Sequence, residues 1–120
     1  MRKYYTIGKD LKVSCFDTKI TADKIIRKLK DTTTPDYYLS DRELASKYDL
    51  KLSMVRKIRE AADLPIKEDR IVKVVRTYPT ETMFLDELVD KLNGRVSYNT
   101  LYKILRTHNI KFLRRNKMNL

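Results

Sequence analysis

An internal repeat constrains the fold of this chain more strongly than any other feature of its sequence. Five apolar positions recur at a constant distance of 46 residues, as Ile25 and Ile71, Leu29 and Val75, Val55 and Leu101, Ile58 and Ile104, and Leu64 and Ile110. A repeat of this length, with its apolar residues at helical spacing, is typical of a helical unit that is present twice. The sequence therefore predicts an all-α fold with two tandem three-helix units, over residues 21–66 and 67–112.

The first helix of each unit is expected to be a scaffold that closes the core, because two short helices alone bury too little apolar surface. Thr21 is a good N-cap residue, and the apolar residues after it predict a helix over about residues 21–30. In the second unit we expect a helix over about residues 67–78. Its apolar stripe consists of Ile71, Val72, Val74 and Val75.

The ends of the chain have patterns of their own. In residues 1–20 a loose alternation of apolar and polar residues favours a short N-terminal arm, or a hairpin around Gly8. The tip of an arm, with Arg2 and Lys3, could cross a minor groove or a phosphate backbone, and a frayed terminus is an equal alternative. Residues 113–120 are expected to form a basic C-terminal tail, which could follow a backbone or lie in a minor groove.

The first unit contains the pattern of two helices joined by a tight turn. Ser40 and Glu43 form a capping box before the middle helix. Asp49 stands at the turn, where aspartate tolerates a left-handed backbone better than most residues, and Ser53 is expected to cap the last helix. Leu44, Ala45, Tyr48, Leu50, Val55, Ile58 and Ala62 are expected to face the core. This order of residues resembles the bacterial and phage helix-turn-helix family, with Asp49 where the family usually has glycine.

The second unit repeats this plan with a longer turn. Asn93 and Gly94 supply the turn, Val96 fills it two residues later than Leu50 does in the first unit, and Ser97 caps the last helix. The expected core residues are Leu88, Val89, Leu92, Leu101, Ile104, Leu105 and His108. Residues 96–105 resemble the recognition segment of transposase and invertase helix-turn-helix domains. The resemblance covers DNA recognition alone, since the chain has no room for the acidic catalytic domain of that family.

The outward faces of the last helices are the candidate DNA-binding surfaces. A rotation of 100° per residue places the outward residues opposite the core, and a helix in a major groove would present them to base edges and phosphates. Asn99 can pair with adenine and Arg106 with guanine. The alternative is that these helix faces are only exposed to solvent. For Tyr102 the alternative is packing against the neighbouring unit. The predicted DNA-binding residues are Lys51, Ser53, Arg56, Lys57, Arg95, Ser97, Tyr98, Asn99, Tyr102, Lys103, Arg106, Lys111, Arg114 and Arg115.

The charge of the chain favours a polyanionic partner. The 120 residues carry a net charge of +11, and no acid follows Asp90. A solubilising charged tail is the alternative. One cysteine, Cys15, excludes an internal disulfide, and no apolar stretch has the length of a membrane span, so we expect a soluble protein in the cytoplasm of a bacterial or phage-infected cell.

The ingredients of a catalytic or metal site are missing from the sequence. His108 and Cys15 are both expected to be buried and give neither a nucleophile pair nor a zinc site. The helical spacing of Asp86, Glu87 and Asp90 is typical of a polar helix face. No glycine-rich phosphate loop occurs, so we expect no enzyme and no cofactor.

Two classes of function remain. The first is a sequence-specific double-stranded DNA-binding protein with tandem helix-turn-helix units, acting as a small phage or mobile-element transcriptional regulator or as a DNA-recognition subunit. The second is a protein interaction module that binds a polymerase or a nuclease. RNA is a weaker third partner, since nothing resembles its single-strand stacking modules. A monomer is favoured because the two units are a direct repeat, and a dimer stays possible.

Overall fold

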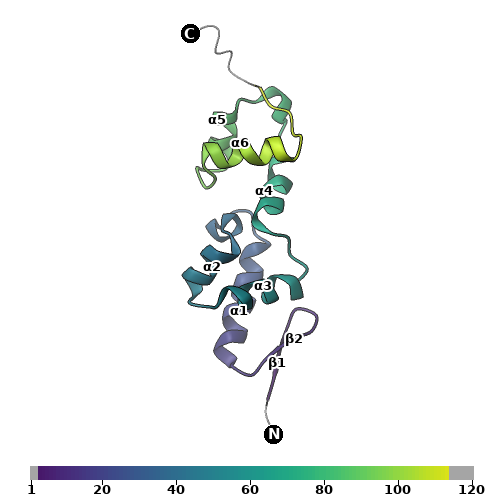
Figure 1. Cartoon of the computed structure of the whole chain (residues 1–120), viewed down its shortest axis with the longest axis vertical. Helices are drawn as coiled ribbons and strands as arrows, with labels where there is room; N and C mark the ends of the chain where they lie inside the picture. The colour runs from purple at the N-terminus through teal and green to yellow at the C-terminus, as the bar shows by residue number, and fades with distance from the viewer. Residues whose placement is uncertain (1–2, 114–120) are drawn as a thin grey trace. The chain divides into compact units, whose positions relative to one another are not determined.

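The computed structural model describes residues 3–113 and is mostly helical, with one small β-hairpin (Figure 1). The chain forms two compact units, Met1–Lys67 and Glu68–Leu120. The first contains β1 (Tyr5–Ile7), β2 (Leu11–Val13), α1 (Phe16–Leu29), the 3-10 turn η1 (Pro35–Tyr38), α2 (Asp41–Tyr48) and α3 (Leu52–Ala61). The second contains most of α4 (Lys67–Val75), the 3-10 turn η2 (Thr80–Thr82), α5 (Leu85–Lys91) and α6 (Tyr98–Thr107).

The hairpin predicted around Gly8 is present. β1 and β2 pair antiparallel, with Tyr5 opposite Val13 and Ile7 opposite Leu11. Ile7 and Val13 are buried and share a core cluster with Ala22 of α1 and Ile58 of α3. The hairpin therefore completes the core of the first unit instead of extending as a free arm. Lys3 is exposed, and Arg2 lies outside the described residues.

The predicted core positions are largely buried in both units. In the first unit Ile25, Leu29, Leu44, Ala45 and Val55 form one cluster, against which Tyr48, Leu50 and Leu64 pack as half-buried side chains. Ala61 is buried where we expected Ala62, which is half-buried. In the second unit Val89, His108 and Ile110 are half-buried. The buried predicted residues there are Ile71, Val72, Val74, Val75, Leu88, Leu92, Val96, Leu101, Ile104 and Leu105.

The prediction for the start of the first helix was wrong. α1 begins at Phe16 with Cys15 as its N-cap, so Thr21 lies inside the helix. The hairpin contacts the start of α1, where the ring centroids of Tyr5 and Phe16 lie 5.3 Å apart, and Asp17 in the first turn favours a helix N-terminus. Cys15 is exposed rather than buried, and the backbone amide of Thr18 lowers the pKa of its thiol. The end of α4 at Val75 is also earlier than expected, because the chain turns there toward Pro79.

The serine caps follow the prediction at two of three helices. Ser40 Oγ accepts a hydrogen bond from the Glu43 amide at 3.2 Å, and Glu43 Oε1 accepts from the Ser40 amide at 3.0 Å. This backbone bond holds the pKa of Glu43 below its ordinary value. Ser97 Oγ accepts from the Thr100 amide at 3.2 Å. Ser53 caps nothing: α3 begins at Leu52, and its N-cap is Lys51, two residues before the predicted cap, since Leu52 packs on the core and is drawn into the first turn.

Four of the helix ends share one geometry. Asp49, Asp63, Asn93 and Asn109 all have φ of 55 or 56°. At each end the next amide donates to the carbonyl five residues back: Leu50 to Ala45, Leu64 to Arg59, Gly94 to Val89 and Ile110 to Leu105. These bonds satisfy carbonyls that the helix leaves unpaired, and aspartate and asparagine tolerate the left-handed backbone they require. The turns predicted at Asp49 and at Asn93 are confirmed.

Equivalent residues of the two units are separated by 46 residues in some elements and by 44 in others, and the apolar pairs alone showed only the first separation. The ends of α1 and α4, and the whole of α3 and α6, correspond at 46 residues, whereas Pro35 and Pro79, and Glu43 and Glu87, correspond at 44. The connection before the middle helix is two residues shorter in the second unit, and the turn after it is two residues longer. The two changes cancel, so α3 and α6 are equivalent elements of their units.

Candidate nucleic-acid interface

α3 and α6 expose the same helical positions. In α3 the side chains of Ser53, Arg56, Lys57 and Glu60 are exposed, and we call this set the α3 face. The residues 46 positions later, Asn99, Tyr102, Lys103 and Arg106, are exposed as well and form the α6 face. The intervening residues, Val55 and Ile58 in α3 and Leu101 and Ile104 in α6, are buried. The predicted outward orientation of both helices is confirmed.

The cations of these two faces differ from other cations of the chain that form ion pairs. Lys47, Arg59 and Lys67 each pair with a carboxylate inside the first unit. Within residues 3–113 no carboxylate forms an ion pair with the predicted DNA-binding cations Lys51, Arg56, Lys57, Lys103, Arg106 and Lys111. Cations that hold the fold together are thus separate from cations that remain available to a ligand.

Arg59 fixes the position of α3. Its Nε lies 3.0 Å from Asp41 Oδ1 at the start of α2, and Nη1 donates to the Leu64 carbonyl at 3.1 Å. Both ion-pair side chains are largely buried, with 11% and 14% of their surface exposed. A guanidinium suits this role because it can bond a carboxylate and a carbonyl at once. No local sequence pattern predicts this pair, which joins residues 18 positions apart.

A buried acid supports the end of α2. Asp36, in η1, is fully buried, and its carboxylate accepts hydrogen bonds from Lys47 Nζ and Tyr48 Oη. Burial raises the pKa of Asp36, but the bonds from Lys47 and Tyr48 outweigh it, so the pKa is lowered overall. Burial and the bond to Asp36 raise the pKa of Tyr48. These bonds hold the residues just before the turn that leads into α3, and the sequence analysis missed them.

Tyr98, Tyr102 and Phe112 are the aromatic residues on or beside the α6 face. Tyr98, at the first position of α6, is 53% exposed. Tyr102 is less exposed, with its ring centroid 6.0 Å from that of Phe112 and 5.9 Å from Arg106 Cζ. Tyr102 therefore packs on residues of its own unit, and this contact orients the Arg106 side chain.

The remaining predicted residues lie beside these helices. Lys51, the N-cap of α3, is exposed, as are Ser97, the N-cap of α6, and Lys111. Arg95, in the turn before α6, is half-buried. Arg114 and Arg115 lie outside the described residues.

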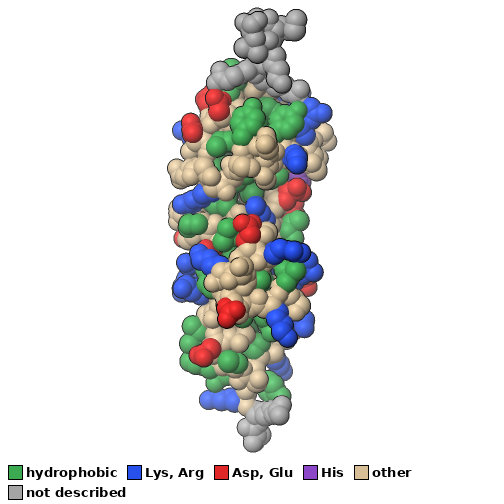
Figure 2. Space-filling view, turned by 60° about the vertical axis from the view of Figure 1, so that its left-hand side comes forward, with side chains coloured by type: hydrophobic (Ala, Val, Ile, Leu, Met, Phe, Trp, Pro, Cys, Tyr) green, Lys and Arg blue, Asp and Glu red, His purple; other side chains and the backbone are tan. Residues whose placement is uncertain are grey.

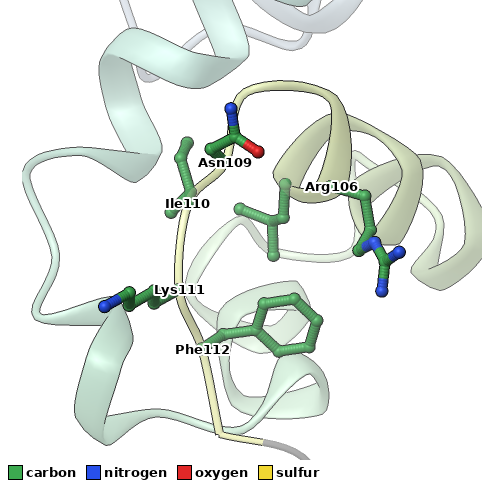
Figure 3. A pocket seen from close by; sticks show the side chains of 6 residues that line it. Arg106, Asn109, Ile110, Lys111 and Phe112 are labelled. Carbon is green, nitrogen blue, oxygen red and sulfur yellow. The ribbon is translucent and has the colours of Figure 1, made fainter.

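A pocket opens at the C-terminal end of α6. Its volume is about 530 Å³, and it is lined by Leu105, Arg106, Asn109, Ile110, Lys111 and Phe112 (Figure 3). The segment after α6 turns back through Asn109, and its backbone is held by the bond from the Ile110 amide to the Leu105 carbonyl at 2.9 Å. The pocket therefore combines two cations and an amide with an apolar floor. Asn109 and Phe112 were not among the predicted site residues, because their place depends on this reversal of the chain.

One cluster of possible metal ligands occurs among residues 3–113. The ligand atoms of Glu68, Asp69 and His108 all lie within 4.8 Å of one another, with His108 Nε2 3.2 Å from Glu68 Oε2. The two acids stand in the first turn of α4, and His108 is the C-cap of α6. Acids at a helix N-terminus and a histidine at a helix C-terminus are favoured by the helix dipole, which accounts for the cluster without an ion.

The surface charge is mixed. Figure 2 shows Lys and Arg side chains on the drawn face of both units, with Asp and Glu side chains among them. Net charge alone therefore does not locate an interface. Among the described helices none is long and apolar enough to cross a membrane.

Three comparisons of this chain, with protein-family models, with curated proteins and with solved structures, find no match. The resemblance to helix-turn-helix families rests on the residues quoted above and stays a prediction. Any function must therefore be argued from the chain's own geometry.

Proposed function

We propose that this protein binds double-stranded DNA through two tandem helix-turn-helix units, with α3 and α6 as their recognition helices. The observation that carries the proposal is the equivalence of the α3 and α6 faces: the same positions are exposed in both helices, and the described cations on them have no ion-pair partner. A helix of this size fits the major groove of B-DNA, and cations exposed on it can contact phosphates and base edges.

The α6 face is suited to sequence recognition. Asn99 lies in the first turn of α6, where recognition helices contact base edges, and its amide can pair with adenine through two hydrogen bonds. Lys103 follows one turn later and carries a charge with no partner within residues 3–113. Tyr98 is exposed enough to contact a thymine methyl group or a phosphate.

The α3 face has a different balance of charge. Arg56 and Lys57 are exposed in the middle of the helix, and Lys51 stands at its start. Glu60 is exposed on the same face, where it repels phosphate and favours cytosine, whose amino group can donate to it. The α3 face therefore contributes less to overall affinity than the α6 face.

The biological role that fits these features is a small transcriptional regulator or a DNA-recognition subunit, of the kind used by phages and mobile elements, working in the cytoplasm. We assign it no catalytic step, no metal and no cofactor. The proposal makes the protein a monomer that carries both recognition helices.

The test is binding to short duplexes of random sequence, followed by fluorescence anisotropy between about 50 and 200 mM salt. We expect log affinity to fall linearly with log salt, with a slope of about −0.9 for each phosphate contact. Arg56→Ala and Lys103→Ala should weaken binding. Lys30→Ala and Lys73→Ala, which remove exposed cations outside the two faces, are the matched controls and should leave it unchanged. Binding that does not change with salt would exclude this function.

A protein partner is the second candidate, and one observation favours it. Phe16 and Ile20, one turn apart on α1, are 55% and 51% exposed, and an apolar surface of this kind suits a protein better than DNA. Capture of a polymerase or a nuclease by the purified protein, lost in Ile20→Lys, together with no affinity for duplex DNA, would establish this alternative.

A further inference from the structure

We propose that the pocket at the C-terminal end of α6 binds the sugar–phosphate backbone of the duplex, with Arg106 and Lys111 contacting two separate phosphates. The inference rests on the proposed DNA-binding function and assigns Arg106 a different role within it. The sequence alone predicted that Arg106 reads guanine.

The walls of the pocket are fixed by the backbone. After α6 the chain reverses at Asn109, and the Ile110 amide donates to the Leu105 carbonyl at 2.9 Å. Further along, the Leu113 amide donates to the Met83 carbonyl at 2.9 Å, and Leu113 forms a parallel bridge with Phe84. The segment with Lys111 and Phe112 is therefore tied at both ends, to α6 and to the residues before α5. A ligand would meet a site that is already formed.

Three residues that line the pocket differ in charge from the equivalent residues of the first unit. The backbone is the same, since Asp63 and Asn109 are both left-handed and both are followed by the same hydrogen bond. Glu60, Asp63 and Pro65 of the first unit correspond at 46 residues to Arg106, Asn109 and Lys111. The formal charge of these three positions is −2 in the first unit and +2 in the second.

In the first unit a cation of the chain itself occupies this place. The amide of Lys9, at the tip of the hairpin, donates to the Ala61 carbonyl at 2.9 Å, and its ammonium group pairs with Asp63. Residues 68–113 contain no hairpin that could do the same in the second unit. The equivalent place there is uncovered and cationic, so its charge complements an anion from outside the chain.

The arrangement of the side chains favours a backbone over a base. Arg106 is the ninth of ten residues in α6, whereas recognition helices contact bases through their N-terminal residues. Its guanidinium lies beside the Tyr102 ring, and a guanidinium bonds a phosphate through two hydrogens. In Figure 3 Arg106 and Lys111 extend to opposite sides of the segment that carries Phe112, so the two cations contact separate phosphates. Phe112, which is half-buried, supplies an apolar surface for the sugar between them.

The experiment measures the salt dependence of binding to duplexes of matched and scrambled sequence. We expect Arg106→Ala and Lys111→Ala each to reduce the slope of log affinity against log salt by about 0.9, and the double variant by about twice that. The loss of affinity should be equal for both sequences, because a phosphate carries no sequence information. Arg106→Lys should keep the slope. Lys73→Ala, an exposed cation of the same unit, is the control and should change nothing.

A second measurement places the contacts. In duplexes where one phosphate at a time is replaced by a neutral methylphosphonate, one replacement should weaken the wild type but not Arg106→Ala, and another should weaken the wild type but not Lys111→Ala. Such coupling identifies direct contact between a side chain and a phosphate.

Three results would overturn the inference, provided that thermal melting shows the variants folded. One is an unchanged slope in both variants while the wild type binds DNA. Another is a loss of preference at one base pair in Arg106→Ala, which would make Arg106 a base reader. If the wild type binds no duplex at all, the proposed function fails, and this inference fails with it.

Discussion

Asp36 shows how a single buried charge supports the first unit. Its carboxylate is fully buried yet accepts bonds from Lys47 and Tyr48, which together lower its pKa despite burial. A carboxyl whose pKa is lower in the folded state stabilises the fold above its unfolded pKa, and this stabilisation is lost as the pH falls through the folded value. The network should therefore be at full strength at neutral pH and fail only in acid.

Asp36→Asn should lower the free energy of unfolding at pH 7 by about 1.5–3 kcal/mol, the value of hydrogen bonds to a charged group. As the pH falls below about 4, where a free aspartate becomes protonated, the difference from the wild type should shrink. Urea unfolding at pH 7 and below about pH 4 measures this difference in the free energy of unfolding. The exposed Asp10→Asn is the control. A difference that stays constant into acid would show that Asp36 is not held ionised by these partners.

Two glycines with the same backbone conformation give a matched pair of variants. Gly8 and Gly94 have φ of +61° and +68°, but a Cβ on Gly8 would lie 2.2 Å from the Ala61 carbonyl oxygen, whereas one on Gly94 meets nothing within 4 Å. Gly94→Ala should cost about 1–2 kcal/mol for the left-handed backbone. Gly8→Ala should cost a further ~1–3 kcal/mol for the overlap with α3. Equal losses in thermal melting would mean that the hairpin tip yields without cost.

At the scale of the helices, local chemistry was predictable and tertiary contact was not. The turns at Asp49 and Asn93 were predicted because tolerance of a left-handed backbone is a property of the residue itself. Thr21 was mistaken for a helix start because α1 is extended by packing on the hairpin, which no local pattern encodes.

The candidate site likewise has one part that could be predicted from the sequence and one part that depends on tertiary contacts. The α3 and α6 faces follow from helical periodicity, which fixes the outward positions once the core is known. The pocket beside α6 could not be derived this way, since it needs the reversal at Asn109 and the distant bond from Leu113 to Met83. One signal was present in the sequence: Glu60 and Arg106 are opposite in charge at equivalent positions of the repeat.

The serine caps offer a test at this scale. Ser40→Ala removes the side-chain half of the capping box of α2 and should cost about 1 kcal/mol. Ser53→Ala, in a helix whose start has no side-chain cap bond, should leave the free energy of unfolding nearly unchanged. If the two variants lose equal stability in urea unfolding, the assignment of Lys51 as the N-cap of α3 is wrong.

For the whole molecule, the distribution of acids makes the two units unequal. The α3 face includes Glu60 among its cations, while no acid occurs after Asp90. We expect Asn99→Ala with Lys103→Ala to weaken DNA binding at least about tenfold, since a bidentate base contact alone is worth about 1–3 kcal/mol. Arg56→Ala with Lys57→Ala should weaken it less, and Glu60→Gln should strengthen it. Anisotropy titrations at one salt concentration compare the three. A stronger effect of the α3 pair would reverse the order of the two units.

The direct repeat also determines the symmetry of the expected site. Because the two proposed recognition helices follow one another in one chain, a monomer could cover two successive segments of major groove without the two-fold axis of a dimer. We expect sites selected from a random DNA pool to be bipartite and non-palindromic, and hydroxyl-radical footprints to show two protected segments of unequal strength. Sedimentation of the complex should give one protein chain per duplex. A palindromic consensus bound by two chains would instead make one of the two units a dimerisation module, and the Phe16 and Ile20 surface would then be the first place to seek the contact.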